Sequence, residues 1–229
     1  MDAFGQMLVD GADAEIVERD DGFIATSMLN YFAPVRHWAA VERRALRWVR
    51  GRVLDVGVGA GRVALELQER GREVVAIDVS PGAVEVARRR GVRDVRLLAL
   101  EDVDESLGRF DTLVMFGNNF GLFGSPAKAQ RLLPRLRPFV SRIVAASNAP
   151  KATDDPAHLA YHERNRRRGR MSGQLRLRVR YRDLIGPWFD YLLVSPEEMA
   201  EIVEGTGWQM RHVVADEGSY YVAVLDRVN

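Results

Sequence analysis

An apolar strand that ends in a glycine-rich turn is the feature that most constrains the fold of this chain. The strand begins at Val53, and three glycines follow it at alternate positions: Gly57, Gly59 and Gly61. Because these positions carry no Cβ, a ligand can lie directly against the backbone of the turn. A helix is expected to start at Arg62, and its first amides favour a ligand with a carboxylate or hydroxyl groups. An acid, Asp55, lies two residues before the first glycine.

The alternation of strand and helix continues to residue 147. Further apolar strands are expected at 73–78, 95–100, 110–116 and 142–147, and helices at 62–70, 82–90 and 125–136. This order predicts a doubly wound α/β fold with a parallel sheet that is covered on both faces. In such sheets ligands bind at the carboxyl ends of the strands. The sequence places Asp78, Glu101–Asp102 and Gly117–Asn119 at those ends, together with the glycine turn.

Two segments lie outside this alternation. Residues 1–50 combine a mixed lead-in with apolar residues at three- and four-residue intervals, which predicts an N-terminal helical cap. Residues 149–194 interrupt the domain that spans residues 51–229. Within them, residues 174–182 alternate strictly between arginine and apolar side chains, and residues 188–194 can return as a partner strand. We therefore expect a β-hairpin inserted after the fifth strand, on the side of the sheet where a substrate would bind.

The last part of the chain predicts a helix and a strand pair. Ser195, followed by a proline and by Glu198, has the pattern of a helix N-terminus with a capping box. Residues 208–215 and 219–225 can form an antiparallel pair around an acidic turn. These two strands bring the expected sheet to seven.

The motifs resemble those of the class I S-adenosylmethionine-dependent methyltransferases. Residues 55–61 resemble the first motif of that family, residues 75–80 the second and residues 110–117 the fourth, and residues 98–102 lie where its adenine-contacting acid is expected. The resemblance covers about residues 50–147, and the helix and hairpin at 195–226 also resemble the ending of the family. It implies a mostly parallel seven-stranded sheet with an antiparallel last strand. It also implies methyltransferase activity (EC 2.1.1.-) with S-adenosyl-L-methionine as cofactor.

The resemblance also assigns roles at the cofactor site. Asp78 would hold the two ribose hydroxyls, Glu101 or Asp102 would accept a hydrogen bond from the adenine amino group, and Asp55 would help to hold the methionine ammonium. Independently of the resemblance, the position of Tyr31 and Arg36 just ahead of the first strand leads us to expect that they cover the cofactor. The expected cofactor-binding residues are Tyr31, Asp55, Gly57, Gly59, Gly61, Asp78, Val79, Glu101, Asp102, Phe116, Gly117 and Asn118.

A dinucleotide is the competing cofactor. Its fingerprint requires a third glycine at position 62, where this chain has Arg62. The acid that precedes the glycines is also poorly suited to a pyrophosphate. Asp78 would fit either cofactor, so the glycine spacing decides for S-adenosylmethionine.

Fewer sequence features indicate the methyl acceptor than indicate the cofactor. Residues 117–121 read Gly-Asn-Asn-Phe-Gly, in place of the Asn/Asp-Pro-Pro-Tyr motif that amino-methylating DNA enzymes and some protein enzymes of the family carry. We therefore expect transfer to an oxygen or nitrogen of a small molecule. His158, Tyr161 and His162 share a helical face in the insertion and are the candidates for a catalytic base or substrate ligand. His37 is expected to pack against a helix, and no metal site is expected.

The insertion leaves two further alternatives open. Between Tyr161 and Arg182 it carries nine arginines and a single acid, Glu163. This patch favours either an RNA methyltransferase or a solvated hairpin face. The balanced net charge of +1 supports the solvated face. A protein that binds the cofactor without catalysis is the remaining alternative.

Composition narrows the cellular setting. The chain of 229 residues has no cysteine, which excludes disulfides and zinc–thiolate sites. No stretch approaches the roughly 18 apolar residues of a membrane span, and the N-terminus has no signal-like pattern. A cytoplasmic protein without a membrane partner is the expectation.

Overall fold

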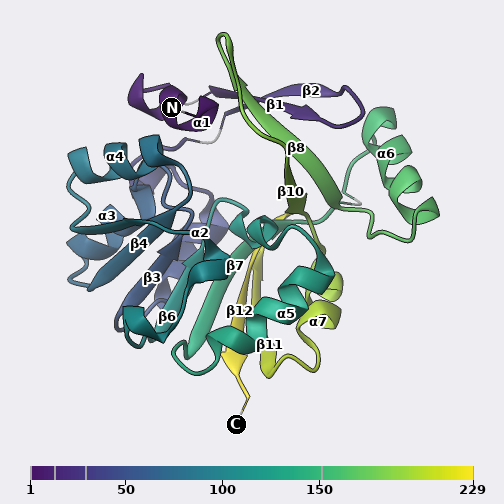
Figure 1. Ribbon diagram of the computed structural model, residues 1–229. Coiled ribbons are helices and arrows are strands. Elements are labelled where there is room, and N and C mark those ends of the chain that lie inside the picture. Colours follow the sequence, from purple (N-terminus) through teal and green to yellow (C-terminus); the bar gives the residue numbers. More distant parts are fainter. Residues whose placement is uncertain (1, 13, 29, 151, 229) are drawn as a thin grey trace.

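The computed structural model describes residues 2–12, 14–28, 30–150 and 152–228. Its main body is a seven-stranded sheet in the order β11-β12-β7-β6-β3-β4-β5 (Figure 1). In chain order the strands are β3 (Val53–Val56), β4 (Val74–Asp78), β5 (Asp94–Leu97), β6 (Thr112–Met115), β7 (Arg142–Asn148), β11 (Trp208–Ala215) and β12 (Tyr220–Arg227). The strands β3 to β7 pair in parallel, and β12 runs antiparallel to both β7 and β11. The predicted topology is confirmed.

Helices cover both faces of this sheet. The helices are α2 (Ala40–Ala45), α3 (Arg62–Glu69), α4 (Pro81–Arg89), α5 (Pro126–Leu136) and α7 (Pro196–Val203), with short 3-10 turns η1 (Val35–His37), η2 (Leu46–Trp48), η3 (Leu100–Asp102), η4 (Glu105–Leu107) and η5 (Asn119–Phe123). On one face α2, α3 and α4 bury residues such as Val41, Leu67 and Ala87. On the other, α5 and α7 bury Leu133 and Met199. Two separate cores therefore enclose the sheet, as the doubly wound pattern predicts.

Serine followed by proline starts three of these helices. Ser80, Ser125 and Ser195 each accept a hydrogen bond from a backbone amide of the first turn, and a proline follows each of them. At Ser195 the expected capping box with Glu198 is complete. Such caps satisfy amides that the helix itself leaves free, and each contributes about 1 kcal/mol.

A smaller antiparallel sheet lies over the carboxyl ends of the parallel strands of the main sheet. Its order is β10-β8-β1-β2, and β9 pairs with β8. The strands are β1 (Ala14–Arg19), β2 (Ile24–Met28), β8 (Gln174–Tyr181), β9 (Leu184–Ile185) and β10 (Phe189–Leu192). Val17 of β1 lies opposite Val179 of β8, and Glu18 lies opposite Arg178. Segments from the N-terminus and from the insertion thus share one sheet, above the main body in Figure 1.

The expected N-terminal helical cap is wrong over residues 14–28, which form the β1–β2 hairpin. Among the described residues of the first 50, helix is confined to α1 (Ala3–Val9), α2 and the turns η1 and η2. The strand pattern of β1 is hidden because Glu15 and Arg19 are charged although they lie on its buried side. A strand with charge on both faces does not show the alternation that predicts a half-buried strand. The predicted hairpin in the insertion is present as β8 and β10, and α6 (Pro156–Arg167) precedes it.

Helix α1 packs against α4 at a contact between two glycines. A Cβ built on Gly82 would lie 2.5 Å from the Cα of Gly5. At the same contact the Asp2 carboxylate accepts hydrogen bonds from the Gly5 amide and from the Ser80 hydroxyl. The close approach therefore ties the start of the chain to the loop that follows β4. Among the described residues, no helix combines the length and the apolar character that a membrane crossing requires.

Gly82→Ala should displace α1 from α4. The added methyl group has no space against the Gly5 backbone, and overpacking of this kind costs about 1–3 kcal/mol. We expect a lower free energy of unfolding in urea and faster proteolysis near the N-terminus. Arg89→Ala, on the exposed side of the same helix, is the control and should leave both unchanged. Equal proteolysis of wild type and Gly82→Ala would contradict the contact.

Candidate functional site

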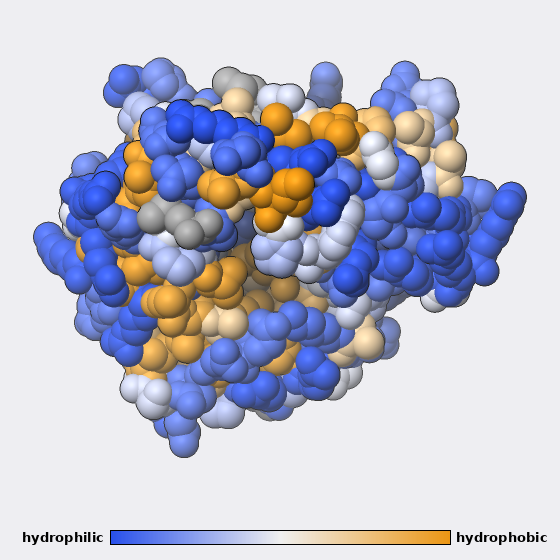
Figure 2. Space-filling view, turned by 45° about the horizontal axis from the view of Figure 1, so that its top comes forward, coloured by the Kyte–Doolittle hydropathy of each residue, from blue (hydrophilic) through white to orange (hydrophobic). Residues whose placement is uncertain are grey.

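A cavity of about 980 Å³ lies between the carboxyl ends of β3, β4 and β6 and the smaller sheet. In the space-filling view a hollow opens between the upper and lower parts of the molecule, with hydrophobic side chains along its margin (Figure 2). We call the part formed by the main sheet the floor and the part formed by β1, β8 and β10 the roof. The site therefore has two walls of different origin.

Asp78 and the glycine turn form the centre of the floor. The Asp78 carboxylate accepts hydrogen bonds from the amides of Gly59 at 3.0 Å and Ser80 at 2.9 Å. Burial raises the pKa of Asp78. Gly59 has a φ of +53°, and a Cβ there would lie 3.3 Å from the Tyr31 ring. Glycine at this position therefore allows both the turn and the close packing of Tyr31 on it.

Two buried oxygens of the floor have no hydrogen-bond partner among the described residues. They are Oδ2 of Asp55 and Oδ1 of Asn118, and both residues line the cavity. Burial raises the pKa of Asp55 to about 7, and the neighbouring Asp78 contributes to that rise. Buried acceptors without a donor are costly, so these oxygens fit a ligand that brings a donor such as an ammonium group.

A buried ion pair closes one end of the floor. Arg62 donates two hydrogen bonds to Glu42, at 2.8 and 2.9 Å. The Glu42 carboxylate also accepts from the Gly117 amide at 2.8 Å and from the Tyr220 hydroxyl at 2.6 Å. Burial alone would raise the pKa of Glu42, but the hydrogen bonds and charge of Arg62 outweigh it and lower that pKa. The first residue of α3 is therefore fixed toward the cavity as one half of an ion pair.

Most of the predicted cofactor residues come together in this cavity. Ten of the twelve line it: Tyr31, Asp55, Gly57, Gly59, Asp78, Val79, Glu101, Phe116, Gly117 and Asn118. Gly61 and Asp102 do not, and neither does Arg36, which is exposed on η1. Of the two acids proposed for the adenine, Glu101 is the one on the cavity, where it forms an ion pair with Lys128.

The roof is mainly apolar. The inner face of β8 contributes Leu175, Leu177 and Val179 to the cavity. Its outer face carries arginines: Arg178 pairs with Glu18 at 2.7 Å, and Arg180 pairs with the same carboxylate at 3.2 Å. The arginine patch therefore points away from the cavity and is partly neutralised by β1.

Glu15 is the exception in the roof. It is 7% exposed, lines the cavity, and forms a hydrogen bond with Tyr31. Burial raises the pKa of Glu15 to about 7, and the hydrogen bond from Tyr31 only partly opposes this. Across the cavity, the Tyr191 hydroxyl donates to the Asn118 carbonyl at 2.7 Å, which joins roof and floor.

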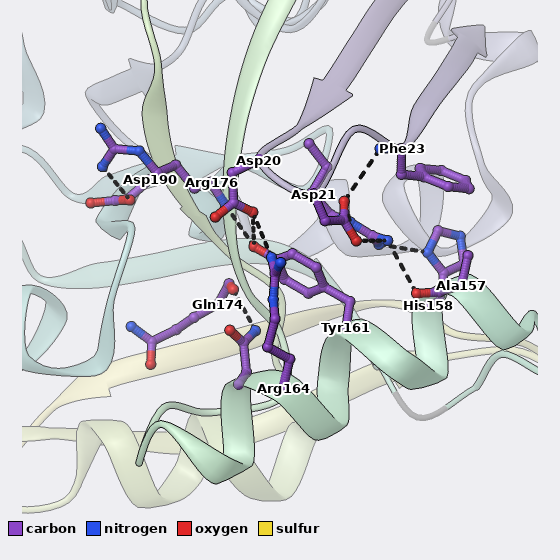
Figure 3. Close-up of polar contacts among 12 residues, drawn as sticks. Asp20, Asp21, Phe23, Ala157, His158, Tyr161, Arg164, Gln174, Arg176 and Asp190 are labelled. Atoms are coloured by element: carbon purple, nitrogen blue, oxygen red, sulfur yellow. Dashed lines mark hydrogen bonds and ion pairs between the residues drawn. The ribbon is translucent and has the colours of Figure 1, made fainter.

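The three predicted catalytic residues lie outside the cavity lining. Figure 3 shows that His158 and Tyr161 project from α6 toward the β1–β2 turn. His158 contacts Arg19 at 2.9 Å, and the Tyr161 hydroxyl donates to Asp20 at 2.7 Å. His162 is buried on the same helix, and burial lowers its pKa. These contacts fasten α6 to the hairpin. His37, expected to pack against a helix, is instead exposed and lines the cavity.

The residues that the sequence did not single out are Glu15, Glu42, Lys128, Tyr191 and Tyr220. They come from the N-terminal region, α5, β10 and β12, and no motif surrounds them. Only the register of the smaller sheet brings Glu15 and Tyr191 to the cavity. Arg62 had a signal, since it replaces the third glycine of the dinucleotide fingerprint.

Comparison with protein families and sequences points in one direction. The family model described as "Methyltransferase domain" matches residues 53–139. A ribosomal protein L11 methyltransferase of Symbiobacterium thermophilum is 40% identical over 125 residues, which cover 47% of this chain and 39% of that protein. A magnesium-protoporphyrin O-methyltransferase of Rhodobacter capsulatus is 39% identical over 67 residues, covering 28% of this chain and 30% of the relative. The match thus spans less than half of each of these relatives.

Solved structures match over the whole fold. An S-adenosylmethionine-dependent methyltransferase from Bacteroides fragilis, in complex with S-adenosyl-L-homocysteine, has a TM-score of 0.82 and 26% identity, over 99% of this chain and 93% of that one. The CcbJ methyltransferase from Streptomyces caelestis has a TM-score of 0.60 and 16% identity, over 87% and 98%. The second likeness concerns the fold alone.

The free energy of unfolding of the wild type should fall between about pH 5 and about pH 8, and Glu15→Gln should reduce this fall. The pKa of Glu15 in the folded protein is about 7, against an ordinary value of 4.5, so folding favours the neutral acid. This stabilising contribution is complete below pH 4.5, the ordinary pKa. It is lost as the pH rises through about 7, the pKa of Glu15 in the folded protein. A shift of this size corresponds to about 3 kcal/mol, and glutamine is neutral throughout. Urea unfolding of both proteins across this range measures the difference.

Glu18→Gln, on the outer face of the same strand, is the matched control. The hydrogen bond from Arg178 lowers the pKa of Glu18, so Glu18 stays charged across this range. The Glu18→Gln variant should therefore keep the pH dependence of the wild type. Parallel stability curves for wild type and Glu15→Gln would show that Glu15 titrates normally.

Proposed function

This chain belongs to the class I S-adenosylmethionine-dependent methyltransferases, and on that premise we propose that it methylates an oxygen or nitrogen atom of a small molecule. The observation that carries the proposal is the cavity of about 980 Å³ between the floor and an apolar roof. Its size, and the combination of an apolar roof with polar groups that converge on the floor, are those of a small-molecule site. The Rhodobacter relative, named as a magnesium-protoporphyrin O-methyltransferase, supports the same class of acceptor.

The floor residues fit S-adenosylmethionine. Asp78, already oriented by two backbone amides, would accept from the ribose hydroxyls, and Glu101 would accept from the adenine amino group. The unpartnered oxygens of Asp55 and Asn118 would receive the methionine ammonium. When bound, the cofactor supplies a methyl carbon activated by a sulfonium. The protein then has to align an acceptor with that carbon and exclude water.

The arrangement of β8 disfavours RNA as the acceptor. Arg178 and Arg180 share the Glu18 carboxylate, and Arg176 pairs with Asp190 at 3.5 Å. Phosphate binding would require these arginines to exchange carboxylate partners for phosphates. The strand turns its apolar face, and not this outer face, toward the cavity.

Asp78→Asn should weaken S-adenosylhomocysteine binding by about tenfold or more, because hydrogen bonds to a charged acceptor are worth about 1.5–3 kcal/mol. Asparagine keeps the size of the side chain, but its one oxygen can accept only one of the two backbone hydrogen bonds that the carboxylate receives. Isothermal titration calorimetry measures the change. Asp102→Asn is the control, since Asp102 does not line the cavity, and it should bind as wild type does. Absence of binding to the wild type would refute the proposed function.

Leu177→Gln and Arg178→Gln separate a small acceptor from RNA. Leu177 lines the cavity and the adjacent Arg178 lies on the outer face. With 4-methylcatechol and N-methylaniline as acceptors, release of S-adenosylhomocysteine should fall severalfold in Leu177→Gln and stay unchanged in Arg178→Gln. A buried amide without partners explains the loss. Turnover of a short single-stranded RNA that declines in Arg178→Gln would favour the RNA alternative.

A further inference from the structure

Glu15 is the one carboxylate that the roof strand β1 presents to the cavity among the described residues. It lies on the same face of β1 as Val17, whose partner Val179 belongs to the apolar face of β8. Its partner Tyr31 packs on Gly59 of the glycine turn. Glu15 is therefore close to the point where roof and floor meet.

Apart from Asp55, the other carboxylates that line the cavity are already engaged. Asp55 lies in the floor beside the glycines, and its unpartnered oxygen is the one proposed to receive the methionine ammonium. The remaining pairs are Asp2 with Ser80, Glu42 with Arg62, Asp78 with the Gly59 and Ser80 amides, Glu101 with Lys128, and Asp190 with Arg176. Glu15 differs from Asp190, the other roof carboxylate, because no cation in the described part of the chain neutralises it and its hydrogen bond comes from a neutral tyrosine.

We propose that Glu15 is the base that takes the proton from the methyl acceptor, and that the acceptor is a mainly apolar molecule presenting a hydroxyl or amine N–H group to it. This inference rests on the proposed function. Glu15 accepts the proton as the acceptor heteroatom forms its bond to the methyl carbon and the carbon–sulfur bond breaks with its electron pair on sulfur. The proton returns to solvent from Glu15 after the product leaves.

The neighbouring tyrosines are poor alternatives as the base. Burial, together with the charge of Glu15, raises the pKa of Tyr31 well above its ordinary value. Burial also raises the pKa of Tyr191, and Glu15 adds to that effect. Glu15 has the opposite property, since a buried carboxylate with a pKa of about 7 can both accept and release a proton at neutral pH. His37 is the rival, as an exposed histidine at the rim of the cavity.

The groups that face Glu15 are few, so its titration can be followed. Tyr31 hydrogen-bonds to it, Tyr191 lies across the cavity, and Asp78 acts on Tyr31. On β8, Tyr181 follows Val179 along the inner face. Arg180 lies in register with Ile16 and turns to Glu18 on the outer face.

The test compares Glu15→Gln, Glu15→Asp and His37→Asn with 4-methylcatechol as the probe, because its phenolic hydroxyls ionise far above neutral pH. In wild type, kcat should rise with pH through an apparent pKa near 7. Glu15→Gln should lower kcat by about 10²–10⁴-fold and remove this rise, which is the range for loss of a general base. Glu15→Asp should restore part of kcat and part of its increase with pH. His37→Asn should keep the increase of kcat with pH.

Binding provides a readout that is independent of turnover. By calorimetry, Glu15→Gln should bind S-adenosylhomocysteine within about twofold of wild type and should bind 4-methylcatechol, without cofactor, about tenfold more weakly, as expected for a lost hydrogen bond to a charged group. This separates the two levels of the argument. Wild type that binds no S-adenosylhomocysteine refutes the proposed function, whereas the outcomes below concern Glu15 alone.

Four results would overturn the role of Glu15. One is a Glu15→Gln variant whose kcat keeps its rise near pH 7. Another is a His37→Asn variant that loses it. A third is a tenfold loss of S-adenosylhomocysteine affinity in Glu15→Gln, which would place Glu15 in the cofactor site. The fourth is a wild type that binds the cofactor but neither binds nor methylates 4-methylcatechol and N-methylaniline.

Discussion

The floor of the cavity depends on the buried ion pair between Glu42 and Arg62. Glu42 comes from α2, Arg62 is the first residue of α3, and the same carboxylate receives Gly117 and Tyr220 from the ends of β6 and β12. Removing one partner of such a pair leaves an unpaired buried charge, at a cost of about 3–5 kcal/mol. The pair therefore fixes four separate segments around the place where the methionine end of the cofactor would lie.

The roof depends on a different balance of charge. β8 carries arginines on one face and aliphatic side chains on the other, and alone it would expose both to water. Glu18 of β1 neutralises Arg178 and Arg180, and α6 is held to the same hairpin through Asp20. Because Arg178 and Arg180 on the outer face of β8 pair with Glu18, the aliphatic face of the strand can lie over the cavity. The N-terminus and the insertion, far apart in sequence, are thus two halves of one wall.

The sequence was most informative where the structure accepts only certain residue types, at a buried strand, a helix start or a tight turn. The parallel strands, the serine–proline helix starts and the glycine turn were predictable because burial on both faces, capping and bare backbone each leave a local pattern. Asp55 and Asp78 could be placed at the cavity for the same reason. Gly61 and Asp102 were assigned by motif position alone, and neither lines the cavity; a Cβ on Gly61 would instead lie against Val92.

The roof was not predictable from local pattern. β1 carries acids on both faces, because one acid neutralises arginines and the other faces a cavity, so its alternation is lost. The pairing of β1 with β8 joins residues more than 150 positions apart, and no short window contains that information. His158 of α6 is a candidate by its chemistry, but its partners are Arg19 at the end of β1 and Phe23 in the β1–β2 turn.

Floor and roof therefore divide the selection of the two ligands. The floor is built from the motifs that resemble those of the methyltransferase family, whereas the roof covers the side of the cavity where we propose that the acceptor binds. The register of β1 determines whether Glu15 faces the cavity. A shift of one residue would turn Glu15 outward and bring Glu18 into the cavity. The Val17–Val179 contact inside and the Glu18–Arg178 ion pair outside both oppose that shift. In the proposed mechanism the arginine face contributes indirectly, because its ion pair with Glu18 helps to hold Glu15 on the cavity side of β1.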